Sequence, residues 1–191
     1  MNVGNQSVSN IIGTKFEFAI FGGGCFWCTE AIFDMVDGVV EATSGYSGGG
    51  TENPTYKEVC LGITGHAEVV HVKYNPQIVS YMQLLEIFFK THDPTSVNRQ
   101  GGDFGNQYRS IVLYNNTEQK RVVETIIKEL DITKIWNKPI VTIVEPFESF
   151  YIAEQYHQEY FRNNSKQHYC QIIITPKIEK FEKLFKGKLK K

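Results

Sequence analysis

The sequence has no long apolar run. Its densest apolar stretch, Leu84 to Phe89, is far shorter than the roughly 18–20 residues that span a membrane. The segment before Lys15 is polar and lacks both the basic start and the apolar stretch of roughly 7–15 residues that mark a signal peptide. We therefore expect a chain that is neither exported nor inserted into a membrane, and we place it in the cytoplasm.

The sequence also has almost no net charge. Its 20 lysines and arginines nearly balance 21 aspartates and glutamates, so the formal net charge is -1. This balance gives no global field that would attract nucleic acid or anionic lipid, and a partner must be recognised at a local site. The basic run from Lys183 to Lys191 is interpreted as the solvated end of a helix, where cations are favoured. A polybasic membrane anchor is the alternative.

Cysteines are few. The four are Cys25, Cys28, Cys60 and Cys170. They are too sparse to act as the disulfide scaffold of a domain of this size. A closed zinc site usually has four ligands at paired spacings, and only one Cys-x-x-Cys pair is present, while His66, His92 and His157 are interpreted as hydrogen-bonded structural residues. Cys60 is interpreted as a small buried hydrophobic side chain. We therefore expect no bound metal, and redox chemistry at a thiol.

Internal repeats and Pro/Ser-rich linkers are absent as well. With 191 residues, 41% of them hydrophobic and 21% charged, the chain fits one domain with a full hydrophobic core. Glycines concentrate at 22–24, 48–50 and 101–105. We interpret these clusters as loops inside that domain.

What the sequence does contain is an alternation of strand and helix patterns. Strands are predicted at Phe16–Phe21, His66–Tyr74, Arg109–Tyr114 and Ile140–Glu145, and helices at Cys25–Met35, from Ser80 onward, at Thr117–Asp131 and at Ala153–Phe161. The helix after Ser80 begins with a capping pattern, Ser80 followed by Gln83. The alternation predicts an α+β domain of two layers, a mixed sheet with packed helices of the ferredoxin-like type.

Cys25 is the first candidate for chemistry because it follows three glycines and would open a helix. At a helix N-terminus, unpaired N–H groups and the positive end of the dipole lower the pKa of a thiol, and the thiolate is the attacking form. The glycines also keep side chains out of the way of a substrate. Phe26 and Trp27 place two large aromatic rings beside the thiol, which suits a pocket lining, with core packing as the alternative. Local context favours a nucleophile over an inert buried thiol.

Glu68 is the second candidate because it shares a strand face with apolar residues. In a strand over His66–Tyr74 it points the same way as Val70, Val72 and Tyr74. Burial disfavours the charged carboxylate, so this glutamate could stay protonated near neutral pH and donate a proton. The alternative is that Glu68, near the end of the strand, points to solvent.

These residues lie in motifs that resemble a known family. The run Gly22-Gly23-Gly24-Cys25-Phe26-Trp27-Cys28-Thr29-Glu30 resembles the signature of peptide methionine sulfoxide reductases of the A type. Further blocks similar to that family follow in the same order: Asn53-Pro54-Thr55-Tyr56, Thr64-Gly65-His66-Ala67-Glu68, Thr91-His92-Asp93-Pro94, Asn98-Arg99-Gln100-Gly101, Asp103, Gln107-Tyr108-Arg109-Ser110 and Ala153-Glu154-Gln155-Tyr156-His157-Gln158. The blocks extend from about Phe16 to Cys170, and so many separate motifs make a chance match implausible.

The resemblance implies an enzyme that reduces the S epimer of free and protein-bound methionine sulfoxide to methionine. It implies that Cys25 attacks the sulfoxide sulfur and that Glu68 protonates the oxygen. By the same resemblance Tyr56 and Tyr108 hydrogen-bond that oxygen, Phe26 and Trp27 hold the substrate methyl group, and Asp103 orients the polar side of the site. From the residues alone, Asp103 in its glycine-rich loop is equally well a turn-forming aspartate.

Regeneration requires a second thiol, because a sulfenic acid on Cys25 condenses with a thiol to a disulfide. Cys170 resembles the resolving cysteine of the family, in a C-terminal tail that could swing to the site. Cys28 stands where the family more commonly has glycine and is the alternative. The sequence has no further cysteine beyond Cys170, which leaves a two-step relay through the tail without its last thiol.

The resemblance further implies a monomer without a bound cofactor, reduced by thioredoxin in the cell and by dithiothreitol in vitro. We divide the chain into a flexible segment 1–15, a catalytic domain 16–165 and a C-terminal tail 166–191. Two rival functions remain open: a general dithiol oxidoreductase that uses Cys25 and Cys28, and a non-catalytic zinc-stabilised binding module.

Overall fold

The computed structural model describes residues 15–190, so all but the last residue of the segment 1–15 lies outside the described residues. The strands are β1 (Glu17–Gly23), β2 (Val39–Ser47), β3 (Ala67–Tyr74), β4 (Arg99–Gln100), β5 (Asp103–Phe104), β6 (Ser110–Tyr114), β7 (Ile143–Pro146) and β8 (Phe150–Ile152). The helices are α1 (Phe26–Asp34), α2 (Tyr56–Cys60), α3 (Tyr81–Thr91), α4 (Thr117–Thr133), α5 (Tyr160–Asn164) and α6 (Thr175–Leu184). Short 3-10 turns cover Asn106–Tyr108, Gln155–His157 and Lys186–Lys188, and a π-helical turn, Cys170–Ile174, leads into α6.

Six of the strands form one mixed sheet in the order β7-β6-β1-β3-β2-β8. The four central strands, β6, β1, β3 and β2, run antiparallel to one another. At one edge β8 is antiparallel to β2, and at the other edge β7 is parallel to β6. The strands β4 and β5 form a separate small hairpin. The chain is therefore a mixed α+β single domain, as the alternating sequence pattern predicts.

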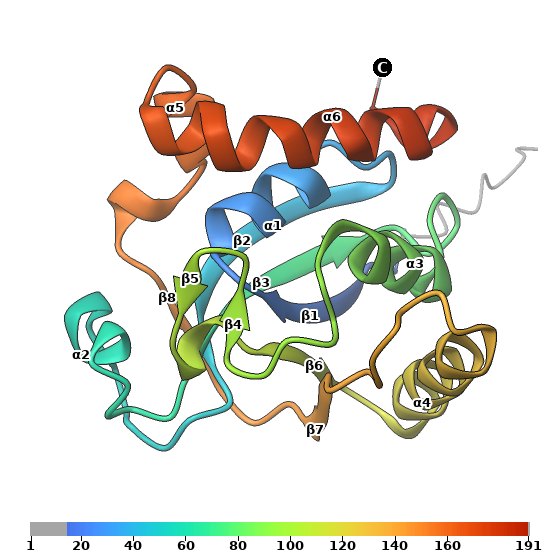
Figure 1. The fold of residues 1–191 in the computed structure, drawn as a ribbon, viewed down its shortest axis with the longest axis horizontal. Coiled ribbons are helices and arrows are strands. Elements are labelled where there is room, and N and C mark those ends of the chain that lie inside the picture. Colours follow the sequence, from blue (N-terminus) through green and yellow to red (C-terminus); the bar gives the residue numbers. More distant parts are fainter. Residues whose placement is uncertain (1–14, 191) are drawn as a thin grey trace, which may run out of the picture.

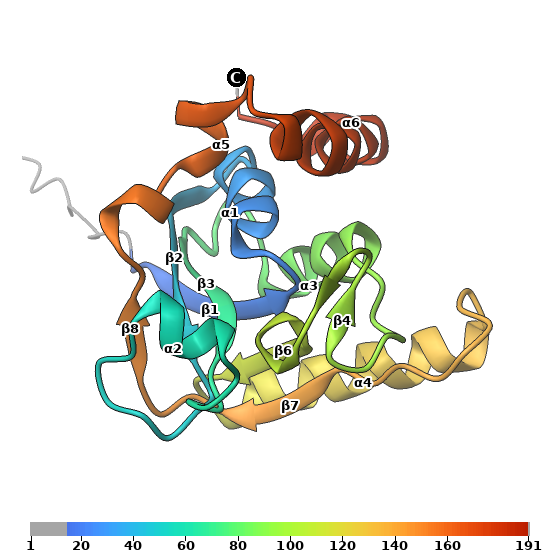
Figure 2. The ribbon, with the colours of Figure 1, turned by 60° about the vertical axis from the view of Figure 1, so that its left-hand side comes forward.

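Helices α1 and α3 pack on one face of this sheet, and α4 lies beside α3 against β6 and β7 (Figure 1). Helix α6 lies over α1 and α3, so it forms an additional layer on the side away from the sheet (Figure 2). The opposite face of the sheet carries a second, smaller cluster of Ile20, Ala67, Val69, Ile111 and Leu113. The sheet therefore has buried apolar residues on both of its faces.

Most of the predicted elements are confirmed, with ends that differ by a few residues. Ser80 accepts a hydrogen bond from the Gln83 N–H and the Gln83 side chain accepts one from the Ser80 N–H, so the predicted capping box begins α3. None of the helices within residues 15–190 is long and apolar enough to cross a membrane.

The predicted helix at Ala153–Phe161 is wrong. The segment forms only the turn Gln155–His157 before α5 begins, and Glu159 between them has a left-handed backbone with φ 48°. Tertiary hydrogen bonds explain the break, since the Gln158 amide bonds both the N–H and the carbonyl of Ser44 on β2. These hydrogen bonds hold residues 153–161, here called the strap, along the edge of the sheet. Contacts with the sheet, and not the helical pattern of the sequence, therefore set the backbone conformation of this segment.

The C-terminal segment 166–191 is helical over most of its described part, 166–190. The turn at Cys170–Ile174 and helix α6 pack against α1 (Figure 1). The chain end is fastened by a bridge between Leu189 and Val36 and by a hydrogen bond of 2.6 Å from Lys190 Nζ to the Asp34 carbonyl. In this structure Cys170 is thus part of a packed helical segment, whereas we expected a tail free to swing.

Candidate active site

The turn from β1 into α1 presents Cys25 at the N-terminus of α1. A side chain at Gly22 would lie 2.7 Å from the Glu68 carbonyl oxygen, and Gly24 adopts φ 98°, a conformation that favours glycine. The turn therefore requires its glycines. Cys25 is the N-cap residue of α1, as predicted.

Glu68 lies beside this helix start and is 1% exposed, so the predicted buried face of β3 is confirmed. Its Oε2 accepts a hydrogen bond of 2.9 Å from the Phe26 N–H, one of the free donors at the start of α1. Burial raises the pKa of Glu68 to about 8, with Asp103 and Cys28 adding to the rise and the Phe26 N–H opposing it. A carboxyl group that stays largely protonated at neutral pH thus lies next to the helix start that presents Cys25.

The expectation that the helix start lowers the pKa of Cys25 is wrong. Burial raises the pKa of Cys25 well above its usual value, and the hydrogen bond with Cys28 and the carboxylate of Glu68 raise it further. The Tyr169 hydroxyl lowers it only in part. The thiol is 6% exposed, so the loss of hydration outweighs the favourable end of the helix dipole.

Two tyrosine hydroxyls gather around the same carboxyl group. Tyr56 begins α2, and Tyr108 ends the 3-10 turn before β6. Burial raises the pKa of each, and the charge of Glu68 raises both further. Both phenols therefore stay protonated and can donate hydrogen bonds to an oxygen held next to Glu68.

Asp103, in the small hairpin, points to the same region. Its Oδ2 accepts a hydrogen bond of 2.9 Å from the Tyr169 hydroxyl. Tyr169 also forms a hydrogen bond with Cys25. The carboxylate thus fixes a phenol that contacts the nucleophile candidate, which sequence spacing could not indicate.

Trp27 is held by three side chains that sequence reasoning did not assign to the site. Its Nε1–H donates to His157 Nδ1 at 3.1 Å, and its indole stacks on Tyr160 at 3.6 Å between ring centroids with 6° between the planes. The edge of Tyr169 contacts it at 5.7 Å. This clamp leaves Trp27 little freedom, as a specific apolar subsite requires.

Glu154 connects this clamp to the tyrosines. Its carboxylate accepts hydrogen bonds from the Tyr46 hydroxyl at 2.8 Å and from the Tyr56 N–H at 2.9 Å, and it lies 4.0 Å from His157 Nε2. The signal for Glu154, His157 and their neighbours was the sequence block 153–158. We interpreted His157 in it as a scaffold residue, and it does hold Trp27 in place.

The two other thiols near Cys25 differ in setting. Cys28, 3% exposed, shares a hydrogen bond with Cys25, which lowers the pKa of Cys28, and Lys177 lowers it further against the effect of burial. Cys170 has no exposed surface, and its pKa is raised by burial and by the charge on Cys28.

The interpretation of Cys60 as buried is wrong. Cys60 is exposed on α2 and hydrogen-bonds the Tyr56 side chain, because Val59 and not Cys60 faces the core.

Two further histidines, His66 and His92, have structural partners. His66 bonds the Gly49 N–H and the Thr51 carbonyl, and His92 bonds the Phe88 carbonyl and the Ser110 hydroxyl. Within residues 15–190 no group of three or more His, Cys, Asp or Glu residues is arranged to hold a metal ion.

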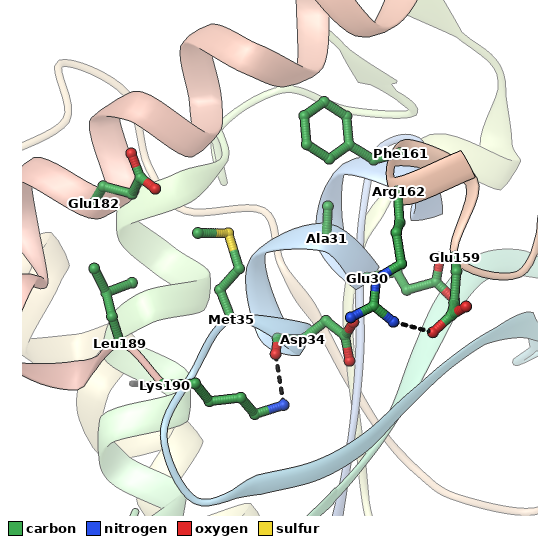
Figure 3. A pocket seen from close by; sticks show the side chains of 10 residues that line it. All are labelled: Glu30, Ala31, Asp34, Met35, Glu159, Phe161, Arg162, Glu182, Leu189 and Lys190. Atoms are coloured by element: carbon green, nitrogen blue, oxygen red, sulfur yellow. Dashed lines mark hydrogen bonds and ion pairs between the residues drawn. The ribbon is translucent and has the colours of Figure 1, made fainter. Parts of the chain in front are cut away.

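A separate pocket of about 480 Å³ lies between α1, α5 and the chain end (Figure 3). Its walls carry Glu30, Asp34, Glu159, Arg162 and Lys190, and Arg162 forms an ion pair of 2.8 Å with Glu159. None of the candidate catalytic residues lines this pocket. The thiol site is therefore not this cavity.

Comparisons with known proteins agree on one family. Residues 17–189 match the family model described as peptide methionine sulfoxide reductase. The chain is 51% identical over 174 residues, 91% of this chain and 97% of the relative, to the peptide methionine sulfoxide reductase MsrA of Saccharolobus solfataricus. Among solved structures, reduced Mxr1 from Saccharomyces cerevisiae is similar with a TM-score of 0.75 and 34% identity, over 83% of this chain and 91% of that one. Mxr1 in complex with Trx2 is similar with a TM-score of 0.53 and 27% identity, over 78% and 86%.

Proposed function

The chain belongs to the peptide methionine sulfoxide reductase family and is an oxidoreductase that reduces methionine sulfoxide to methionine, and on this premise we propose that Cys25 takes the oxygen with Glu68 as proton donor. The observation that carries the assignment is the Glu68 carboxyl group, buried and bound to the Phe26 N–H at the helix start that presents Cys25. A neutral acid next to a thiol is the pair that sulfoxide reduction needs, because oxide leaves sulfur only when protonated.

In the proposed step, Cys25 Sγ forms a bond with the sulfoxide sulfur as Glu68 donates its proton to the oxygen. The oxygen passes to Cys25 as a sulfenic acid, and methionine leaves. The thiol proton that Cys25 loses restores Glu68, so the step neither takes up nor releases a proton overall. The raised pKa values of both groups support this route, since each holds its proton until the substrate arrives.

The other site residues would bind the substrate. Tyr56 and Tyr108 donate hydrogen bonds to the sulfoxide oxygen, and Phe26 and Trp27 enclose the methyl group. Asp103 orients the polar side of the site through Tyr169. An oxygen subsite and a methyl subsite on fixed sides of one sulfur distinguish its two epimers, and we propose the S epimer as substrate, free or within a protein.

We propose that the sulfenic acid is resolved by an intramolecular disulfide, with Cys170 or Cys28 as partner, and that thioredoxin reduces it. The complex of the similar protein Mxr1 with Trx2 supports the choice of reductant. We further propose a monomer in the cytoplasm, without cofactor and without a nucleic-acid or membrane partner. The strand order β6-β1-β3-β2 supports the ferredoxin-like type for the central sheet.

The test is turnover of methionine S-sulfoxide and R-sulfoxide by the purified protein, with dithiothreitol and then with thioredoxin. Methionine should form from the S epimer with either reductant. Reduction of insulin disulfides without sulfoxide turnover would instead favour the dithiol oxidoreductase, for which the Cys25–Cys28 hydrogen bond provides a basis.

Replacing His157 by phenylalanine should lower kcat/KM for methionine sulfoxide by about 3- to 10-fold. The phenyl ring fills similar space but accepts no hydrogen bond from the Trp27 indole, and one such bond contributes about 0.5–1.5 kcal/mol. His168→Phe, at an exposed position near the same strap, is the matched control. Equal kcat/KM for the two variants would contradict a role of His157 in placing Trp27.

A further inference from the structure

Cys28 lies one helical turn beyond Cys25 on the same side of α1. Its N–H donates a hydrogen bond of 3.1 Å to the Cys25 carbonyl, so the first turn of the helix joins the two residues. Both side chains are buried, and both belong to the main hydrophobic core of the domain. Residues three positions apart at the start of a helix are neighbours on its surface, so the two thiols lie side by side on α1.

Helix α6 brings a cation to this pair of thiols. It lies over α1 in both views of the fold (Figures 1 and 2), and the charge of Lys177, on the first turn of α6, lowers the pKa of the Cys28 thiol. The ionisable groups that influence Cys28 or are influenced by it are Cys25, Glu68, Asp103, Tyr169, Cys170 and Lys177. Lys177 is the one member of this set with a positive charge, so it alone favours a thiolate at Cys28 by direct attraction.

Cys170 differs from Cys28 in both its position and its environment. It sits inside the π-helical turn, and its carbonyl accepts a hydrogen bond of 3.0 Å from the Thr175 hydroxyl. No part of its side chain is exposed, and its pKa is raised chiefly by burial. Cys170 therefore lies on a different element from Cys25, in the π-helical turn that packs against α1.

We propose that Cys28 is the thiol that resolves oxidised Cys25, and that Lys177 is a positioning residue that holds Cys28 as the attacking thiolate. This inference rests on the proposed function and deepens it. Cys28 Sγ forms the S–S bond with Cys25 Sγ while the S–O bond of the sulfenic acid breaks. The leaving hydroxide takes a proton from Glu68, and the proton that Cys28 gave up replaces it, so water is the only product besides the disulfide. A dithiol reductant then supplies the two electrons and two protons that reopen the disulfide.

The assignment of roles follows from the two environments. Cys25 lies against the carboxyl group of Glu68 and holds its proton until substrate binds, which suits oxygen transfer. The pKa of Cys28 is lowered by its interaction with Cys25 and by the charge of Lys177, so Cys28 loses its proton more readily, which suits attack on an electrophilic sulfur. The same burial would otherwise have made both thiols inert.

A single-turnover experiment tests the proposal. Reduced enzyme is mixed with one equivalent of methionine sulfoxide in the absence of reductant, between pH 6 and pH 9. Methionine is measured by chromatography, sulfenic acid by trapping with dimedone, and the disulfide by alkylation and peptide mass spectrometry. Lys177→Met is compared with Lys180→Met, an exposed lysine on the same helix, and with Lys177→Arg, which keeps the charge.

In the native protein, disulfide should form between Cys25 and Cys28 while Cys170 remains open to alkylation after unfolding. Lys177→Met should slow that step about 3- to 10-fold at pH 7. Loss of a nearby cation raises a thiol pKa by about one unit or more, and the smaller thiolate fraction is partly offset by its greater nucleophilicity. The pH at which the rate levels off should rise in Lys177→Met and return toward the native value in Lys177→Arg.

A Cys25–Cys170 disulfide in the native protein would overturn the proposal. So would disulfide formation in Lys177→Met at the native rate across the pH range. If methionine forms in one equivalent but the sulfenic acid persists, the resolving step assigned here is wrong while the proposed function stands. If no methionine forms, the proposed function falls and this inference falls with it.

Discussion

Replacing Cys25 by serine is expected to abolish methionine formation, with a loss of at least about 10⁴-fold, since removal of a nucleophile from a covalent mechanism costs up to about 10⁶-fold. A serine hydroxyl cannot accept the oxygen and later release it through a disulfide, because that cycle depends on sulfur redox chemistry. The loss should be the same with dithiothreitol and with thioredoxin. It should appear in the first turnover, before any disulfide is needed.

Cys60→Ser is the matched control for this variant. Cys60 is also close to Glu68 and Tyr56, but it lies on the exposed side of α2, and a serine there can still hydrogen-bond the Tyr56 hydroxyl. The control should retain most of the activity. Residual single-turnover methionine formation by Cys25→Ser, together with its loss in Cys28→Ser, would move the nucleophile to Cys28.

Replacing Glu68 by glutamine should lower kcat by about 10²- to 10⁴-fold, the contribution that a positioned general acid typically makes. The amide has nearly the same shape, and its oxygen can still accept the hydrogen bond from the Phe26 N–H, so the helix start should stay in place. Glu41→Gln on the neighbouring strand β2, where the side chain is exposed, is the control. Substrate affinity should change much less than kcat, because the lost proton matters in the transition state.

The pH dependence separates the chemical role of Glu68 from a structural one. The pKa of Glu68 is raised to about 8, so the protonated donor is present below that pH, and the oxygen-transfer rate should fall as pH rises through it. Glu68→Gln should lack this descending limb. A native profile that stays level well above pH 8 would contradict the assignment.

The same pKa predicts an effect on stability. The unfolded carboxyl titrates near 4.5, so the folded state keeps a proton that the unfolded state loses between that pH and about 8. This contribution to stability is therefore fully present below about 4.5 and is lost progressively up to about 8. Glu68→Gln does not titrate. The melting temperature of Glu68→Gln, relative to that of the native protein, should therefore be higher at pH 8 than at pH 5.

Local sequence was sufficient for the parts of the fold that depend on neighbouring residues. The spacing of Val70, Val72 and Tyr74 predicted which face of β3 carries Glu68, and the side chain is buried on that face. Ser80 and Gln83 predicted the start of α3 because a capping box involves only four residues. Three glycines before Cys25 predicted the helix start at the thiol.

Local sequence failed where distant contacts decide the backbone. Ala153–Phe161 has a helical pattern, but the hydrogen bonds of Gln158 with Ser44, 114 residues away, hold it as a strap. Cys170 was expected in a free tail, yet α6 and the turn before it bury it against α1. Neither contact can be predicted from the hydrophobic periodicity of the segment itself.

The sequence by itself indicated the family, three of the four central strands, the helices α1 and α3, and Cys25 and Glu68 as the proposed reactive pair, but it did not indicate β2. Only the tertiary structure decided how burial and neighbouring charges shift the pKa of each thiol, and which side chains hold Trp27. The physical reason is that a pKa depends on burial and on charges nearby in space. Lys177 lies 149 positions from Cys28 in the sequence and His157 lies 130 from Trp27, yet in the fold the charge of Lys177 acts on Cys28 and His157 binds the Trp27 indole.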